Sequence, residues 1–279
     1  MFRASPSPTA AAPSLEPTGS SSDRTTRASK TAERLRAAGV HLALSALLAA
    51  LVLVAVLLTW YPQPLARLLG VGPILLIMLG VDVVLGPIFT LIVFDRRKKR
   101  LAWDLATIAF VQLTALAYGL YTLEQGRPAY IVLVKDRFEI VSPAEVMPAD
   151  QAEAKNNPLA KPHLAGPRWV SVRMPDSASD RSRILFEALD TGRDVQHHPR
   201  FYADYESQVG EAMTRSLPVS KLRSLNPSSG KDIDAAVAAS GLSESALRYF
   251  PMRGPAADGA VLVSQADGRV LKVLPLKPW

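Results

Sequence analysis

The stretch GVGPILLIMLGVDVVLGPIFTLIVF, Gly70 to Phe94, decides the fold because it is long and apolar enough to cross a lipid bilayer. Its centre nevertheless carries Asp82, Gly86 and Pro87. A carboxylate at the middle of a membrane costs at least ~2.5 kcal/mol on insertion scales, and glycine and proline both weaken helices. Asp82 therefore marks either a reaction, a partner site or a packing device, and the rest of the chain must decide among these.

Two further apolar runs flank this stretch. They are AGVHLALSALLAALVLVAVLLTW, residues 38–60, and LAWDLATIAFVQLTALAYGLYTL, residues 101–123. Each exceeds the ~20 residues that cross the hydrocarbon layer, and the first ends in an aromatic pair suited to the membrane interface. The sequence predicts a transmembrane region at residues 38–124, with helices at 38–60, 70–94 and 101–123.

Basic residues predict how these helices are oriented. The leader, residues 1–37, is rich in Ser, Thr, Pro and Ala with scattered Arg, and we expect it to be disordered and cytoplasmic. Arg67 is the only basic residue between the first two helices. The next loop is a block of five cations: Arg96, Arg97, Lys98, Lys99 and Arg100. By the positive-inside rule, the N-terminus and this block lie in the cytoplasm, and the third crossing places the rest in the periplasm of a Gram-negative cell.

Residues 125–279 read as a separate exported domain. Residues 131–134 and 138–141 are rich in β-formers and predict a bent strand or a hairpin, and 168–174 predicts another strand. Helices are predicted at 180–189, 201–215 and 231–239, and a hairpin at 261–274 turning at Asp267-Gly268. The expected class is therefore a membrane α-helical region plus an α+β domain with a small, mainly antiparallel sheet.

Composition excludes several functional classes. The chain has 279 residues, a net charge of +7 and no cysteine. Disulfides, thiol catalysis and cysteine metal sites are therefore absent. The positive charge is concentrated in the loop block and no nucleic-acid-binding motif accompanies it, so no nucleic-acid partner is expected.

Two of the membrane helices carry polar stripes. Asp82, Gly86 and Thr90 are four residues apart and share one helix face. On the third helix a stripe is formed by Asp104, Thr107, Thr114, Tyr118 and Tyr121. Such stripes should turn away from lipid, so they face either each other or a transmembrane helix of a partner.

An intramembrane aspartyl dyad is disfavoured by depth. Asp82 lies about 18 Å from the end of its helix at Phe94, whereas Asp104 lies about 4–5 Å from the same membrane surface. Two carboxylates about 13 Å apart in depth cannot share a proton. A polar packing face, or a binding face for another membrane segment, fits better.

The remaining motifs do not form a catalytic site. QHHPRFYADY, Gln196 to Tyr205, pairs two histidines with acids but has no zinc-type spacing, so a loop leading into a helix is favoured. No glycine-rich phosphate loop or nucleophile elbow is present in the sequence. We predict no cofactor, no metal and no enzymatic activity.

Several pieces resemble the TfpX/TfpZ family of type IV pilin accessory proteins. They are VDVVLGPIFTLIVF with the basic loop after it, DRFEIV at 136–141, GRDVQHHPRFYADY and ADGRVLKVLPLKPW. The resemblance covers about residues 70–279. It implies an inner-membrane protein that supports pilin stability or pilus assembly, with type IV pilin, other pilus-assembly proteins and the lipid bilayer as partners. It transfers no catalytic residue.

The resemblance suggests a role for the polar stripes. Before assembly, type IV pilins reside in the membrane as single helices with polar groups near the N-terminus. Such a helix needs a polar partner. We hypothesise that the partner-binding residues are Asp82, Gly86, Thr90, Asp104, Thr107, Thr114 and Tyr118. Two alternatives remain open, namely a membrane enzyme that modifies or processes pilin and a sensor of a periplasmic ligand.

Overall fold

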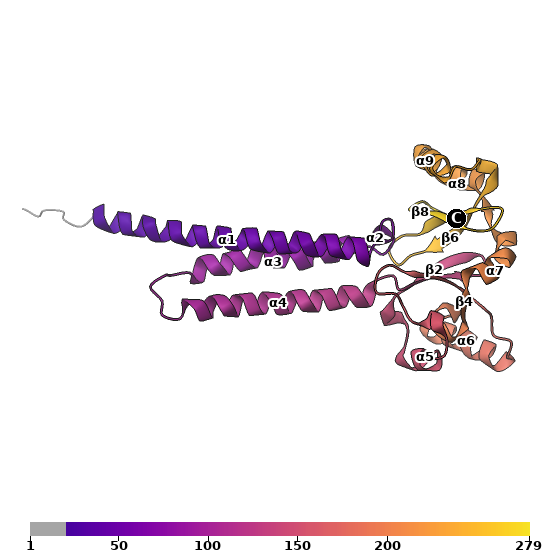
Figure 1. Ribbon diagram of the computed structural model, residues 1–279, viewed down its shortest axis with the longest axis horizontal. Coiled ribbons are helices and arrows are strands. Elements are labelled where there is room, and N and C mark those ends of the chain that lie inside the picture. The colour runs from indigo at the N-terminus through magenta and orange to yellow at the C-terminus, as the bar shows by residue number, and fades with distance from the viewer. Residues whose placement is uncertain (1–20) are drawn as a thin grey trace, which may run out of the picture.

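The computed structural model describes the backbone of residues 21–279 and shows a long helical bundle joined end-on to a C-terminal domain (Figure 1). The bundle consists of α1 (Ser21–Thr59), α3 (Gly72–Val93) and α4 (Leu101–Gly126). All three are long and apolar enough to cross a membrane. The three predicted apolar helices are therefore confirmed.

The first helix differs from its predicted start. It begins at Ser21 rather than near residue 38. The intervening stretch, TTRASKTAERLRAA, has good helix formers and no glycine or proline, so the helix continues through it into the apolar run. Residues 21–37 are thus helical where disorder was predicted, and the rest of the predicted leader, residues 1–20, lies outside the described residues.

The C-terminal domain is built on one mixed sheet. Its strands are β1 (Tyr130–Val134), β2 (Arg137–Val141), β3 (Arg168–Val172), β4 (Tyr202–Asp204), β5 (Leu217–Pro218), β6 (Leu247–Arg253), β7 (Gly259–Ser264) and β8 (Val270–Leu274). The strand order is β4-β3-β1-β2-β6-β7-β8, and β5 pairs with β6. The pairs β1–β3 and β2–β6 are parallel and the other ladders are antiparallel, which confirms the predicted class.

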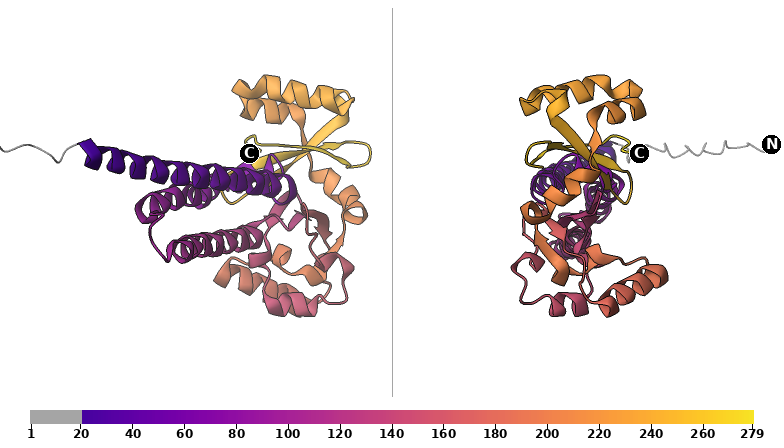
Figure 2. Two further views of the ribbon diagram at one scale, coloured as in Figure 1. Left: turned by 60° about the vertical axis from the view of Figure 1, so that its left-hand side comes forward. Right: turned by 90° about the vertical axis from the view of Figure 1, so that its right-hand side faces the viewer.

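Short helices pack around this sheet (Figures 1 and 2). They are α5 (Pro148–Glu153), α6 (Ala178–Thr191), α7 (Tyr205–Ala212), α8 (Val219–Leu225) and α9 (Gly230–Ser240). One of them, α7, lies against the central strands of the sheet. Helices α8 and α9 lie beside β6 to β8, whereas α5 and α6 lie at the β4 end (Figures 1 and 2).

The local predictions for this domain are mostly confirmed, with one correction. Residues 130–141 form a hairpin rather than a bent strand, and β7 and β8 form the second predicted hairpin, with Gly268 at φ 68°. The helix predicted from Phe201 is wrong at its start, because residues 202–204 pair with β3 and α7 begins only at Tyr205. Pairing at the sheet edge outweighs the helical pattern there.

The connection between α1 and α3 enters the core of the C-terminal domain. Its short helix α2 (Leu65–Leu68) contributes Leu65 and Leu68 to a cluster that includes Phe138 and Phe250. The Leu68 carbonyl also accepts hydrogen bonds from the amides of residues 256 and 257, at 3.0 and 3.2 Å. We call this contact the joint, and it fixes the bundle to the domain.

Candidate functional site

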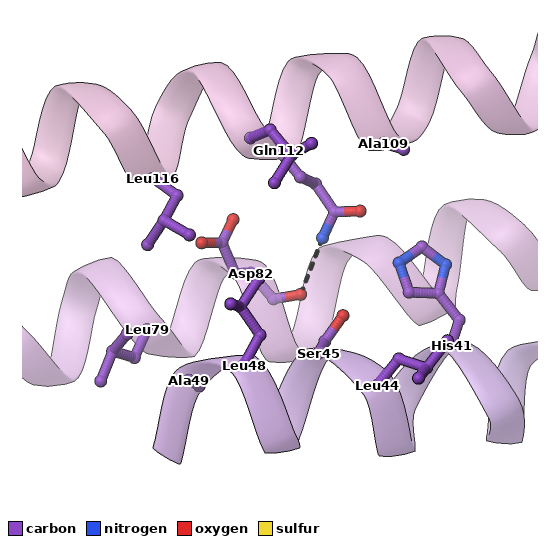
Figure 3. A pocket seen from close by; sticks show the side chains of 11 residues that line it. His41, Leu44, Ser45, Leu48, Ala49, Leu79, Asp82, Ala109, Gln112 and Leu116 are labelled. Atoms are coloured by element: carbon purple, nitrogen blue, oxygen red, sulfur yellow. Dashed lines mark hydrogen bonds between the residues drawn. The ribbon is translucent and has the colours of Figure 1, made fainter. Parts of the chain in front are cut away.

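Helices α1 and α4 both pack against α3 but make little contact with each other. A hollow of about 210 Å³ opens between them, with α3 as its floor (Figure 3). Its lining residues are His41, Leu44, Ser45, Leu48 and Ala49 from α1, Leu79 and Asp82 from α3, and Ala109, Gln112, Leu113 and Leu116 from α4. We call it the membrane groove, and it is the principal candidate site of the chain.

Asp82 supplies the acidic group of the membrane groove. Its carboxylate projects from α3 toward the gap between α1 and α4 (Figure 3). Within the described part of the chain, this carboxylate has no side-chain hydrogen bond or ion pair, because Gln112 bonds only the backbone carbonyl of Asp82. A carboxylate without a donor in an apolar setting is costly. The Asp82 carboxylate therefore keeps its capacity to accept hydrogen bonds.

Gly86 makes room for a contact inside the bundle. A Cβ at Gly86 would lie 2.2 Å from Gln112 Nε2, so a larger residue would displace the Gln112 amide from this position. Gln112 Nε2 then donates to the Asp82 carbonyl at 2.9 Å. Pro87, next to Gly86, lies inside α3 and has no backbone amide hydrogen to donate. The close approach expected at Gly86 is thus made by the chain's own α4.

Thr90 is also engaged inside the bundle. It is buried, and its Oγ1 hydrogen-bonds His41 Nδ1 on α1 at 2.6 Å. A second hollow of about 730 Å³ shares His41, Leu44 and Ala109 with the membrane groove and continues toward the basic loop. Of the three stripe residues on α3, Asp82 alone remains open to the groove.

The stripe on α4 turns away from α3. Tyr118 is 72% exposed, and Thr107 and Thr114 lie on the same outer side. The hydroxyls of Thr107 and Thr114 donate to the carbonyls of residues 103 and 110, at 2.9 and 2.8 Å. Two of the expected donors are thus satisfied within their own helix, and the two stripes do not face each other.

Asp104 lies at the basic-loop end of the bundle. Its carboxylate is 3.7 Å from Lys98 Nζ, and Lys98 also donates to the Val93 carbonyl at 3.2 Å. This pair ties the start of α4 to the end of α3. Asp104 is therefore neutralised by the chain, whereas Asp82 is not.

Of the paired histidines, His198 takes part in an ion-pair cluster of the C-terminal domain. His198 is 1% exposed, with Nδ1 2.9 Å from Asp150 and Nε2 3.5 Å from Glu187. Arg193 bridges the same two carboxylates. Burial alone would raise the pKa of Asp150, but hydrogen bonds from Arg193 and His198 lower it below its usual range. The cluster locks α5 to α6.

The neighbouring His197 has a different role. The Asp194 amide donates to His197 Nδ1 at 3.2 Å, which requires a neutral ring. Burial lowers the pKa of His197 below its usual value of 6.5, although Glu145 opposes this. Among the described residues, no group of three His, Asp or Glu side chains has metal-binding geometry. Both histidines thus stabilise the fold of this segment.

Sequence reasoning did not identify His41 and Gln112 as members of the site. Each was identifiable, because His41 is the only titratable residue in its apolar run and Gln112 is the only amide in residues 101–123. Gln112 also lies seven residues from Gly119 and Leu105, which places all three on the side of α4 that faces α3. The predicted stripe contained only hydroxyl and acidic side chains, and these lie on the outer side of α4.

Comparison with known proteins gives a consistent set of similarities. The family described as fimbrial assembly protein FimB matches residues 29–70, which form most of α1 and the connection into the joint. The chain is 26% identical to the fimbrial assembly protein, serogroup I, of Dichelobacter nodosus, covering 77% of this chain and 84% of that protein. It is 32% identical to the serogroups C1 and C2 protein, covering 39% of this chain and 85% of that one. No solved structure matches the chain significantly.

Proposed function

Because the chain belongs to the fimbrial assembly protein (FimB) family, we propose that it is an inner-membrane accessory protein of type IV pili. It binds the pilin, the subunit of the pilus, and maintains it in the membrane until assembly. Its closer kinship to the TfpX/TfpZ type is part of this proposal and rests on the motifs VDVVLGP and DRFE.

The proposed orientation follows the charges. The basic loop, residues 96–100, and the N-terminus lie in the cytoplasm, and the C-terminal domain lies in the periplasm. A pilin with one transmembrane helix and an exported head would then lie alongside both parts of the chain. The joint would keep the two binding surfaces in a fixed relation.

One observation carries the proposal. The three helices leave an open groove between α1 and α4, and the carboxylate in that groove has no partner among the described residues. A protein whose work is to hold another membrane segment needs such an unfilled polar surface. An enzyme would instead need catalytic side chains that converge on one point. The name of the related fimbrial assembly proteins also supports an assembly role.

Deletion of the gene in its natural host tests this function. We expect the cognate pilin, measured by immunoblot of membranes, to fall in amount, or surface pili to disappear while pilin remains. The first result would indicate stabilisation and the second assembly. Unchanged pilin together with an unchanged number of surface pili would overturn the proposal.

A further inference from the structure

We propose that the membrane groove holds a single transmembrane helix of the pilin and that a hydrogen-bond donor on this helix meets the Asp82 carboxylate. This inference rests on the proposed function and locates its membrane contact. It narrows the expected binding face from two helix stripes to one groove.

The packing of the bundle leaves room for a fourth helix. Helices α1 and α4 contact α3 from two sides and barely touch each other. Apolar side chains that line the gap remain accessible, since Leu44, Leu48 and Leu113 are 62%, 41% and 57% exposed. A guest helix in this position would pack against all three helices and complete a four-helix arrangement.

The shape of the groove also suits a helix. The two connected hollows are lined on α1 from Glu33 to Ala49, a span of about 24 Å at helical rise. The apolar part of this wall runs on α1 from Ala37 to Ala49, about 18 Å, and is interrupted by His41 and Ser45. A lipid tail could cover such a wall, but it has no donor for Asp82.

Charge complementarity favours a polar group on the occupant. The Asp82 carboxylate is the only acidic group in the lining of the membrane groove, and no described residue pairs with it. A donor carried by the guest helix, such as an amine, an amide or a hydroxyl, would satisfy it.

A second copy of this chain fits less well. Its exposed polar stripe on α4 would be the natural guest surface, and in a copy of the same membrane orientation Thr114 lies nearest to the depth of Asp82, because Gln112 bonds the Asp82 carbonyl. The Thr114 hydroxyl already donates to the Phe110 carbonyl and would have to break that bond to reach Asp82. The pilin helix is therefore the occupant that we assign.

Site-specific crosslinking in membranes that contain the cognate pilin tests the inference. A photoreactive p-benzoyl-phenylalanine replaces Leu113 in the full chain, and a matched control places it at Val111. The two positions are 57% and 58% exposed, lie about 200° apart around α4, and only Leu113 lines the groove. We expect the pilin adduct to be at least fivefold stronger from position 113, and Asp82→Leu to reduce it at least threefold.

Three outcomes would overturn the inference. They are equal adducts from both positions, an adduct with a second copy of the chain in place of pilin, and no adduct from position 113. If pilin still depends on the chain for its stability or assembly, such a result removes the groove assignment alone. If pilin neither co-purifies with the chain nor depends on it, the proposed function fails as well.

Discussion

The bundle and the C-terminal domain bury their apolar residues to very different degrees. In the domain, every residue of β1 and β7 is buried. In the bundle, only 6%, 11% and 6% of the most apolar windows of α1, α3 and α4 are buried. The domain closes its own core, whereas the bundle leaves its surface to its surroundings.

The difference shows where functional information lies in each region. The hydrophobic effect places apolar residues in the core of the domain, so the buried side chains of the domain are explained by folding. Lipid covers the apolar residues of the bundle at little cost, so the polar residues of the bundle indicate where helices contact one another. Asp82 differs from the apolar residues around it because its carboxylate receives no hydrogen bond from the described residues and lipid tails carry no donor.

The joint is where the two regions depend on each other, and breaking it should have the largest effect. Leu68 belongs to the connection in sequence but is 0% exposed in the domain core. Leu68→Ala should lower the free energy of unfolding by about 2–5 kcal/mol, because it leaves a cavity in the core of the domain. Urea unfolding of the full chain in detergent, followed by the fluorescence of Trp169 beside Phe138, measures this.

A bundle residue provides the matched control for that substitution. Leu58 lies on α1 and is 76% exposed, so Leu58→Ala should change the unfolding free energy little. Equal effects of the two substitutions would show that the joint does not support the domain.

Gly70 tests the geometry of the same joint with a smaller change. Its φ is +67°, and a Cβ there would lie 2.7 Å from the Ala256 Cβ. Gly70→Ala should cost about 1–3 kcal/mol through backbone strain. Gly72→Ala is the control, because nothing lies within 4 Å of its added Cβ. The same unfolding assay would contradict the account if both variants matched the parent chain.

Gln112 tests the packing of α4 on α3. Gln112→Leu removes the hydrogen bond to the Asp82 carbonyl and should cost about 0.6–1.7 kcal/mol, the range for such bonds between membrane helices. Thr114→Val is the control, since that hydroxyl bonds only its own helix. Thermal unfolding in detergent should separate the two, and a larger loss for Thr114→Val would refute the assigned helix faces.

Acid should weaken the domain slightly through His197. Its pKa is lowered in the folded state by burial, so the unfolded chain binds a proton more readily. The stabilisation is complete above about pH 6.5 and is lost as pH falls through the folded-state pKa. The melting temperature should therefore fall between about pH 7.5 and 5.5. His197→Gln should flatten this dependence, and an unchanged slope would exclude His197 as its source.

The sequence predicted the architecture well because long-range patterns are robust. The three helices follow from the length of the apolar runs, and the hairpin at 261–274 follows from its β-formers and its Asp-Gly turn. For 131–141 the pattern left a bent strand and a hairpin open, and the structure has the hairpin. It did not predict that Leu65 and Leu68 join the domain core, since a short apolar turn between two membrane helices also suits the interface. Similarly, the helical pattern at 180–189 did not predict that α6 buries Ile184 and leaves Leu185 and Leu189 exposed.

The candidate site was predictable only in part. The central carboxylate and the close-approach glycine could be recognised from their spacing in GVDVVLGP. Which helix Gly86 and Thr90 contact depends on the rotation of α1 and α4 about their axes, and a stripe pattern does not fix that rotation. Gln112 and His41 therefore emerged only from the packed structure.

Capture of the cognate pilin by full-length variants tests the central claim most directly. Asp82→Asn removes the unpaired charge of the membrane groove, and Asp104→Asn removes a carboxylate paired with Lys98 outside it. Asn keeps one acceptor oxygen but carries no charge, and a charged acceptor strengthens a hydrogen bond by about 1 kcal/mol. Pull-down from detergent-solubilised membranes should therefore recover about threefold to tenfold less pilin with Asp82→Asn. Recovery with Asp104→Asn should match the parent chain. Full recovery with Asp82→Asn, or an equal loss with both variants, would contradict the account.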